Sequence, residues 1–486
     1  MIADAGWNFD NTYSKMPGIL LSNVRPSPVV SPSVVVINET LTDELNLNFS
    51  IVKKEDLAKI LSGNLLPLGS DAIAQAYAGH QFGYFTVLGD GRAILLGEHI
   101  NKNNMRFDIQ LKGSGKTPYS RNGDGRAALG PVLREYIISE AMHGLNIPTT
   151  RALAAVTTGE DVVRESLLPG AILTRVASSH LRVGTFQYVA MKKDFRVLKK
   201  LVDYTVDRHY PSLKNFENKA LELLKVVVEK QIDLTIGWMR VGFIHGVMNT
   251  DNMSISGETI DYGPCAFMNA YNTKTVFSSI DYQGRYSYGN QPSITHWNLL
   301  RFAEALIPLI NKNEGKAVEK INVVFSDFIE KYKKRWLDMM KKKIGLLGEQ
   351  DGDEALVHDL LSWMEKRKVD FTNTFVFLTH NKLVGGNCFN DNFFNSWFKR
   401  FKNRIESSGG SFEKSKKIME KNNPLIIPRN HIVESVLKES VLNNNLSPLK
   451  ELVSYLKRPY SLSSNIAKYQ APPKDGDVGF KTFCGT

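Results

Sequence analysis

A short polar segment near the middle of the chain holds the residues with the most evident chemistry. The segment His245-Gly-Val-Met-Asn-Thr-Asp251-Asn252 is followed, after a few polar residues, by Ile260-Asp261-Tyr-Gly-Pro264. An amide oxygen from Asn252 and a carboxylate from Asp261 are hard oxygen ligands, which bind Mg²⁺ while substrate phosphates complete its octahedron. Asp251 places a second carboxylate directly before the amide. These residues therefore predict metal-dependent phosphate chemistry, with Mg²⁺ or Mn²⁺ as the metal.

Protein kinases hold their metal ions with the same residue types, an Asn in the catalytic loop and the Asp of an Asp-Phe-Gly sequence. Asn252 and Asp261 match these positions, but Val247 occupies the position of the kinase base, five residues before the Asn. A valine can neither accept nor orient a proton. Asp251 is the nearest replacement carboxylate, so ordinary hydroxyl phosphorylation is not the expected geometry. The alternative is a pair of Asn- and Asp-rich turns without chemistry, which explains either segment alone better than both together in this order.

Residues upstream of this segment complete a candidate nucleotide site in kinase order. In Leu88-Gly89-Asp90-Gly91-Arg92 the glycines would let backbone amides approach a phosphate, although an ordinary hairpin also explains them. Lys112 ends an apolar run, where its ammonium group could meet phosphates, and Glu135 could pair with it from the next helix. Arg175 and Arg182, seven residues apart, suit bidentate phosphate contacts but are equally consistent with surface arginines.

A basic, glycine-rich loop runs from Gly113 to Arg126. Its Gly115-Lys-Thr117 superficially looks like a Walker A loop, but the glycine spacing that this loop requires is missing, so we reject a P-loop. The loop could instead cover a polyphosphate, with Asp124 and Gly125 touching the nucleotide.

Hydrophobic patterning indicates how these residues are positioned. Between residues 77 and 124, short β segments alternate with glycine, and the Asp90-Gly91 pair predicts a tight hairpin between Phe85–Leu88 and Arg92–Gly97. Apolar residues spaced by three and four predict a helix over residues 130–145, behind Pro131. Beyond Arg182, helical periodicity dominates over residues 218–241, 296–311, 320–343 and 353–366.

The predicted fold class is α+β, a bilobal protein-kinase-like fold with a small β-rich N-lobe and a larger α-helical C-lobe. Residues 1–180 would form an N-terminal wrap and the nucleotide-binding lobe. Residues 181–345 would form the α-rich lobe with the catalytic and metal loops, and residues 346–486 a C-terminal helical extension and tail.

Composition excludes several classes of protein. Of the 486 residues, 42% are hydrophobic and 23% are charged, as in soluble globular proteins. No apolar stretch approaches the roughly 18–20 residues that span a bilayer, and the first ten residues lack the features of a secretory signal. We expect a cytoplasmic monomer without membrane contact. The net charge of +11 gathers in helical runs, interpreted as solvated faces, so no nucleic acid is expected; a basic RNA-binding protein remains an alternative.

The three cysteines, Cys265, Cys388 and Cys484, are too few and too scattered for a disulfide framework or a CxxC zinc site. They predict a reducing compartment. Cys484 is the third residue from the end, where a redox or partner-linking role is an alternative to an inert tail thiol.

Together these motifs resemble the SelO family, also called YdiU, of protein adenylyltransferases with a pseudokinase fold. The resemblance also reaches Phe9–Tyr13 and the C-terminal cysteine, and it is densest in the segments Tyr77–Gly83, Leu88–Arg92, Gln110–Gly115, Tyr119–Leu129, His245–Asn252, Asp261–Pro264 and Gln283–Tyr286. It implies that ATP lies inverted relative to ordinary kinases. The α-phosphate would then face an acceptor hydroxyl, and AMP would be transferred with release of pyrophosphate. This would give Val247 a rationale.

The resemblance also implies roles for single residues. Asp251 would accept the hydroxyl proton, Asn252 and Asp261 would bind the metal, and Glu135 would hold Lys112. ATP contacts are implied for Gly89, Gly91, Arg92, Lys112, Asp124, Gly125, Arg175, Arg182 and Asp261. Substrates would be Ser, Thr or Tyr hydroxyls of proteins, with a link to redox homeostasis.

Two departures from relatives concern cysteine. Some relatives carry selenocysteine where this chain has Cys484, and some carry a cysteine in the loop where this chain has Phe277-Ser-Ser279. Whether Cys484 forms a regulatory disulfide is therefore left open. The leading prediction is a protein adenylyltransferase; the alternatives are an ATP-binding pseudokinase scaffold and a conventional phosphotransferase.

Overall fold

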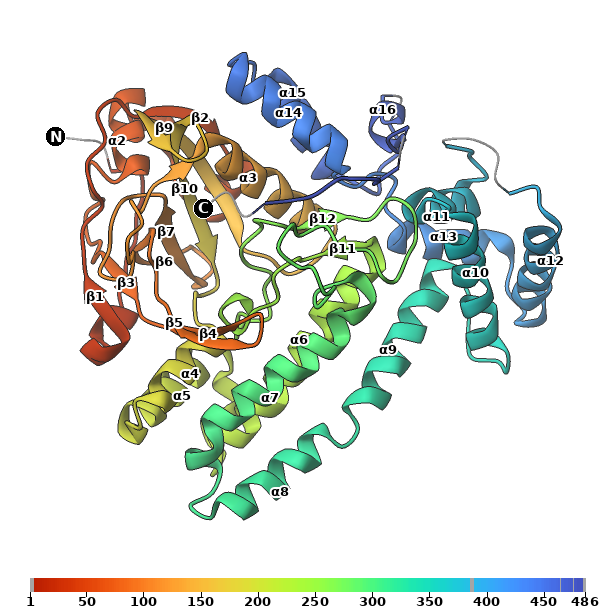
Figure 1. The fold of residues 1–486 in the computed structure, drawn as a ribbon, viewed down its shortest axis with the longest axis horizontal. Coiled ribbons are helices and arrows are strands. Elements are labelled where there is room, and N and C mark those ends of the chain that lie inside the picture. The colour runs from red at the N-terminus through yellow and green to blue at the C-terminus, as the bar shows by residue number, and fades with distance from the viewer. Residues whose placement is uncertain (1–3, 385–388, 464, 475, 484–486) are drawn as a thin grey trace.

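The computed structural model describes residues 4–384, 389–463, 465–474 and 476–483 (Figure 1). A β-sheet with its covering helices comes first in the chain, and packed helices follow it. All paired strands are antiparallel. Helices and an antiparallel sheet thus make a mixed α and β fold, in agreement with the pattern in the sequence. No helix in the described ranges combines the length and the apolar character needed to span a membrane.

The main sheet has the strand order β1-β3-β6-β7-β10-β9-β2, and β8 pairs with β10. The strands of the structure are β1 (Leu21–Asn23), β2 (Ser33–Ile37), β3 (Ile73–Gln75), β4 (Ala78–Gln81), β5 (Tyr84–Val87), β6 (Ala93–Ile100), β7 (Arg106–Lys112), β8 (Ala127–Ala128), β9 (Arg151–Val163), β10 (Leu167–Ala177), β11 (Phe243–Ile244) and β12 (Ala266–Phe267). The early strands β1 and β2 lie at opposite edges of the main sheet, so the N-terminal segment runs from one edge of the sheet to the other. The two longest strands, β9 and β10, were not anticipated from the sequence.

The predicted hairpin at Asp90-Gly91 is wrong. Strand β5 pairs with β4 in a separate two-stranded sheet, whereas β6 pairs with β3 and β7. The β4–β5 turn is formed by Phe82 and Gly83, both with positive φ, as a two-residue hairpin requires. Asp90 is buried, and its Oδ2 accepts hydrogen bonds from the Gln75 backbone N (3.1 Å) and the Gln110 side chain (3.2 Å). Asp90 therefore makes buried hydrogen bonds and does not form a turn between two paired strands.

The helices also differ in one respect from the prediction. They are α1 (Glu39–Glu44), α2 (Lys54–Ser62), α3 (Leu129–Gly144), α4 (Val183–Met191), α5 (Phe195–His209), α6 (Lys219–Val241), α7 (Gln291–Ile310), α8 (Glu314–Phe325), α9 (Phe328–Lys343), α10 (Asp353–Arg367), α11 (Phe371–His380), α12 (Asn392–Ser407), α13 (Phe412–Asn422), α14 (Asn430–Leu442), α15 (Ser447–Leu456) and α16 (Ala467–Gln470). Short 3-10 helices occupy Tyr13–Lys15, Gly18–Leu20, Phe49–Ile51, Pro211–Leu213, Thr250–Asn252 and Tyr288–Asn290. The single helix predicted over residues 320–343 is wrong, because the helical conformation is interrupted between the end of α8 at Phe325 and the start of α9 at Phe328.

Helix α3 packs between the main sheet and the C-terminal helices α14 and α15. One side of α3 packs on β9 and β10, and α14 and α15 pack against it as well (Figure 1). A hydrophobic core of buried residues runs through this contact and includes Leu133, Ile137, Leu449 and Leu452. The C-terminal helices therefore help to fix the helix that carries Glu135.

The short pair β11–β12 positions the central polar segment. Phe243 faces Phe267 and Ile244 faces Ala266 in antiparallel register. The loop with Asp251 leaves β11, and Asp261 lies just before β12, so this pairing brings both loops to one place.

A buried polar network ties the sheet to α5. Asp108 on β7 accepts hydrogen bonds from Arg208 Nη2 (2.6 Å) and His180 Nδ1 (2.9 Å). Arg208 Nη1 also pairs with Glu98 on β6 at 2.6 Å. Burial lowers the pKa of His180 to about 4, and burial lowers that of His209, which contacts Ser179, to about 3.

These two histidines predict acid sensitivity. The unfolded chain protonates them near the usual pKa of 6.5, whereas the folded chain does so only near 4 and 3. The unfolded state therefore binds more protons as the pH falls below about 6.5, and the free energy of unfolding decreases. We expect the melting temperature to fall between about pH 7 and pH 5, measured by circular dichroism. His180→Gln should flatten this dependence. An unaltered slope in the His180 variant would contradict the assignment.

Candidate functional site

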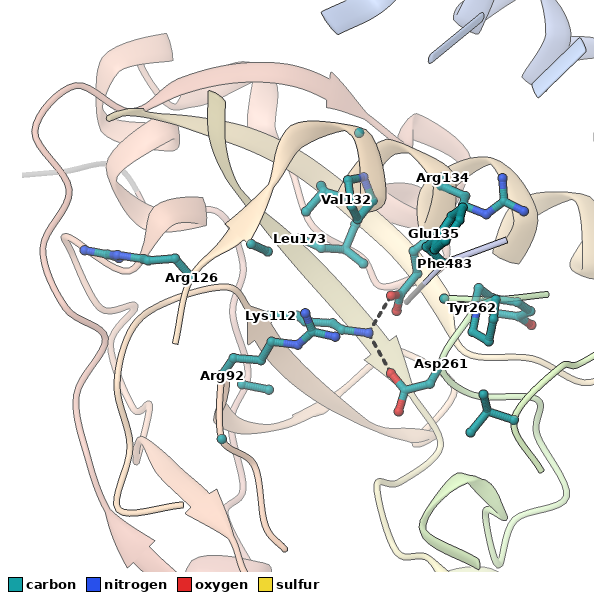
Figure 2. A pocket seen from close by; sticks show the side chains of 18 of the residues that line it. Arg92, Lys112, Arg126, Val132, Arg134, Glu135, Leu173, Asp261, Tyr262 and Phe483 are labelled. Atoms are coloured by element: carbon teal, nitrogen blue, oxygen red, sulfur yellow. Dashed lines mark hydrogen bonds and ion pairs between the residues drawn. The ribbon is translucent and has the colours of Figure 1, made fainter. Parts of the chain in front are cut away.

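A cavity of about 950 Å³ is lined by residues of the sheet, of α3, of the two central loops and of the C-terminal part of the chain (Figure 2). All the site residues predicted from the sequence line it, namely Gly89, Gly91, Arg92, Lys112, Asp124, Gly125, Glu135, Arg175, Arg182, Asp251, Asn252 and Asp261. Segments more than 150 residues apart in the chain thus meet at one cavity.

Lys112 lies at the centre of a group of charged side chains. Its Nζ lies 2.6 Å from Glu135 Oε2 and 2.6 Å from Asp261 Oδ1, as Figure 2 shows. Strand β7 supplies the lysine, α3 the glutamate and the loop before β12 the aspartate. The Lys112–Glu135 pair agrees with the expected contact. The second contact, with Asp261, was not predicted.

Two arginines reach the same aspartate. Arg175 Nη1 lies 2.9 Å from Asp261 Oδ1 and 3.3 Å from Glu135 Oε1, and Arg182 Nη1 lies 3.5 Å from Asp261 Oδ2. Both arginines are only 2% exposed, which rules out the interpretation as surface arginines. Burial alone would raise the pKa of Asp261, but Lys112, Arg175 and Arg182 outweigh burial and hold it well below its usual value. Asp261 is therefore ionised in the folded chain.

Asp251 has a different environment. It lies in the 3-10 helix Thr250–Asn252 and is 7% exposed, and its Oδ1 has no hydrogen-bond partner among the described residues. Burial raises the pKa of Asp251 to about 6, against the opposing effect of Arg182. A carboxylate with a pKa this close to neutrality can exchange a proton with a bound group.

Strand β4 holds the loop that carries Asp251. The backbone N of His80 donates to Thr250 Oγ1 (2.7 Å), and that of Phe82 donates to Asn249 Oδ1 (3.1 Å). Gly79 has no side chain where β4 passes the Asp251 carboxylate, and a Cβ there would collide with it. The β4–β5 hairpin thus fixes the position of this carboxylate.

The metal ligands expected from the sequence are Asn252 and Asp261. Asn252 Nδ2 donates to the Val247 carbonyl (3.0 Å), so the amide oxygen is the atom left for a ligand. No group of three or more His, Cys, Asp or Glu side chains suited to a metal occurs within the described ranges. One ionised carboxylate and one amide oxygen fit a divalent cation that takes its remaining ligands from phosphates and water.

The glycines of the site have tight neighbours. A Cβ on Gly91 would lie 2.9 Å from the Tyr119 carbonyl oxygen, and Gly125, with φ +69°, lies against the backbone of Gly115. Gly89 abuts the Tyr119 ring. Gly89 and Gly91 therefore let the basic loop pack on residues 89–91, and Gly125 lets the two ends of that loop approach each other.

Asp124 and Arg92 of the site differ in whether their charged groups are already paired within the protein. The Asp124 carboxylate pairs with Arg164 Nη1 at 2.8 Å, a partner that was not predicted. Arg92 makes no ion pair in the part of the chain that the structure describes, and it lines the cavity beside Lys112 (Figure 2). Its guanidinium group can therefore take an anionic ligand without giving up a protein partner.

Sequence reasoning missed Asp90 and the C-terminal tail. Arg182 Nη2 lies 3.6 Å from Asp90 Oδ1. This contact was not predicted, because Asp90 was assigned to a hairpin turn. Thr482 in the tail donates from Oγ1 to the Pro264 carbonyl (2.6 Å) and from its backbone N to Phe277 (2.8 Å), beside the cavity. No local pattern in the sequence indicates these long-range contacts.

Cys265 is the cysteine that lies within the described residues. Cys265 is buried and free, and burial raises the pKa of its thiol to about 12, which keeps it protonated. Cys388 and Cys484 lie outside the described residues, and so does any disulfide that involves Cys484.

The chain is similar to known proteins over almost its whole length. The sequence profile of the family described as "Protein adenylyltransferase SelO" matches residues 6–457. The chain is 54% identical over 481 residues to the "Protein nucleotidyltransferase YdiU" of Pelagibacter ubique, covering 99% of both chains. It is 52% identical over 483 residues to proteins of the same name from Geobacillus kaustophilus and Brevibacillus brevis, covering 99% of this chain and 100% and 98% of theirs.

Proposed function

The chain belongs to the SelO family of protein adenylyltransferases, and from this membership we propose how its cavity performs nucleotide transfer. The protein is a nucleotidyltransferase that transfers AMP from ATP to other proteins. The acceptors that we propose are Ser, Thr and Tyr hydroxyls. We further propose that the sheet, α3 and the central loops correspond to the kinase arrangement, with residues 1–180, 181–345 and 346–486 as its three regions.

The cations of the cavity would bind the triphosphate. Lys112, Arg175 and Arg182 already neutralise Asp261 and Glu135, and Arg92 has no ion pair of its own within the described ranges. A triphosphate brings several negative charges into this group, and its oxygens can accept the remaining N–H donors of the guanidinium groups. Fixed cations that face the leaving pyrophosphate stabilise the charge that develops on it in the transition state.

Asp251 is the proposed proton acceptor, and its environment is the observation that carries the proposal. The hydroxyl oxygen would form a bond to the α-phosphorus while the bond from that phosphorus to the β-phosphate oxygen breaks. The hydroxyl proton passes to Asp251, and the electron pair leaves with pyrophosphate. A buried carboxylate with an unpartnered Oδ1 and a pKa of about 6 is suited to this step.

Asn252 and Asp261 would hold Mg²⁺ or Mn²⁺. When bound, the metal supplies positive charge to the phosphate oxygens and orients them. The support for this assignment is the ionised state of Asp261 and the amide orientation set by Val247.

An isotope experiment separates AMP transfer from the alternatives. With ATP labelled at the α-phosphate, label should enter protein, and with ATP labelled at the γ-phosphate, none should, because pyrophosphate carries the γ label away. The measurement is autoradiography of protein after electrophoresis, followed by mass spectrometry of the modified residues. Incorporation of the γ label alone would identify a phosphotransferase, and ATP binding without either label would identify a scaffold.

A further inference from the structure

A second cavity of about 370 Å³ shares no lining residue with the nucleotide cavity. Tyr271 and Tyr288 line it from the segment that follows Asp-Tyr-Gly-Pro. Helices α9, α10 and α11 supply Trp336, Glu365 and Phe371 respectively. It therefore lies where the segment after Asp261 meets helices α9, α10 and α11.

Aromatic rings form much of this cavity. The Tyr271 ring stacks on Phe371 with 5.7 Å between centroids and 20° between planes, and it meets the Tyr288 ring edge to face at 6.1 Å. Trp336 and Tyr332 add two rings from α9, and one face of Trp336 stacks on the His358 ring at 5.5 Å, which leaves its other face for a ligand. The faces of aromatic rings carry partial negative charge, so a cavity of this kind attracts organic cations.

The carboxylate of Glu365 in this cavity also favours a positively charged ligand. Glu365 is half-buried, and its Oε1 accepts one hydrogen bond, from Thr273 Oγ1 at 3.3 Å. Neither lysine nor arginine lines the cavity. The basic side chain among its lining residues is His358, whose Nε2 lies 3.6 Å from Glu354 Oε1, and Glu365 is in none of the ion pairs of the described residues. A partly buried carboxylate outside any ion pair favours the entry of a cation.

We propose that this cavity is a binding site for a small organic cation of the alkylammonium class. The aromatic faces of Tyr271, Tyr288 and Trp336 contact the alkyl groups on the nitrogen, and the Glu365 carboxylate balances the positive charge. The volume of the cavity is sufficient for a ligand of this size. The site is separate from AMP transfer, and its existence does not depend on the proposed mechanism.

Calorimetry on the full-length protein tests the site with choline chloride as the probe. The neutral isostere 3,3-dimethyl-1-butanol, in which carbon replaces the charged nitrogen, is the matched ligand. We expect choline to bind with a dissociation constant below about 10 mM and the isostere at least about tenfold more weakly. Absence of choline binding, or equal binding of the isostere, would overturn the proposal.

Two variants locate the binding. Glu365→Gln removes the charge at nearly constant shape, and Trp336→Leu removes one aromatic face; each should weaken choline binding at least about tenfold. The matched control is Asp359→Asn, also on α10, whose carboxylate pairs with Arg400 at 2.6 Å outside the cavity. This control should bind choline like the wild type. Unchanged affinity in both cavity variants places choline elsewhere and rejects the site.

Discussion

Replacing Asp251 with Asn should lower the rate of AMP transfer by about 10²–10⁴-fold, which is the usual contribution of a general base. The amide keeps the shape of the side chain but cannot accept the hydroxyl proton. Affinity for ATP should stay near that of the wild type, because the cations that we propose to bind the triphosphate are untouched. Single-turnover transfer with labelled ATP and calorimetry with ATP measure the two quantities.

Stability distinguishes this outcome from misfolding. The wild-type carboxylate is buried with an unpartnered oxygen, so its neutral replacement should melt at a temperature no lower than the wild type at pH 7. Glu434→Gln is the matched control, because Glu434 also lines the cavity but is half exposed and pairs with Arg134. That control should retain transfer. A fully active Asp251→Asn protein would remove Asp251 from the mechanism.

Replacing Asp261 with Asn should reduce transfer at least as much, for a different reason. The variant loses the ionised carboxylate that we propose as a metal ligand, so Mg²⁺ should no longer strengthen ATP binding. It also leaves Lys112, Arg175 and Arg182 with fewer counter-charges in a buried site, so the melting temperature should fall. Calorimetry of ATP binding with and without Mg²⁺ measures the first effect, and thermal denaturation measures the second.

The control for this variant is Asp124→Asn. Asp124 lines the same cavity, but its carboxylate pairs with Arg164, and no metal is assigned to it. Its replacement should leave the dependence of ATP binding on Mg²⁺ intact, even if the affinity changes. If the Asp261 variant still shows wild-type dependence on Mg²⁺, then Asp261 is not a metal ligand.

Elements with strong local patterns were predictable from the sequence. Helix α3 was expected over residues 130–145 and occupies Leu129–Gly144, and α6 was expected over residues 218–241 and occupies Lys219–Val241. In both, apolar residues recur along one face over several turns. The break between α8 and α9 was missed, because both sides of the break continue a helical pattern.

Strand pairing was predicted less well. The Asp90-Gly91 pair has the residue types of a tight turn, but β5 and β6 belong to different sheets. Turn residues describe only the local path of the chain. The partners of a strand are the distant segments whose backbone N–H and C=O groups reach its two edges, and for β6 these segments are β3 and β7.

The sequence by itself determined the chemical types of the site and their order along the chain. Lysine, glutamate, an Asn loop and Asp-Tyr-Gly can be read without coordinates, and with the family resemblance they identified a nucleotidyltransferase. Only the tertiary structure decided the states of these groups. It placed Asp261 among three cations and left Asp251 buried with an unpartnered oxygen, so the two carboxylates have pKa values shifted in opposite directions. The pKa of a carboxyl group depends on its burial and on charges a few ångströms away, and those charges come from segments distant in sequence.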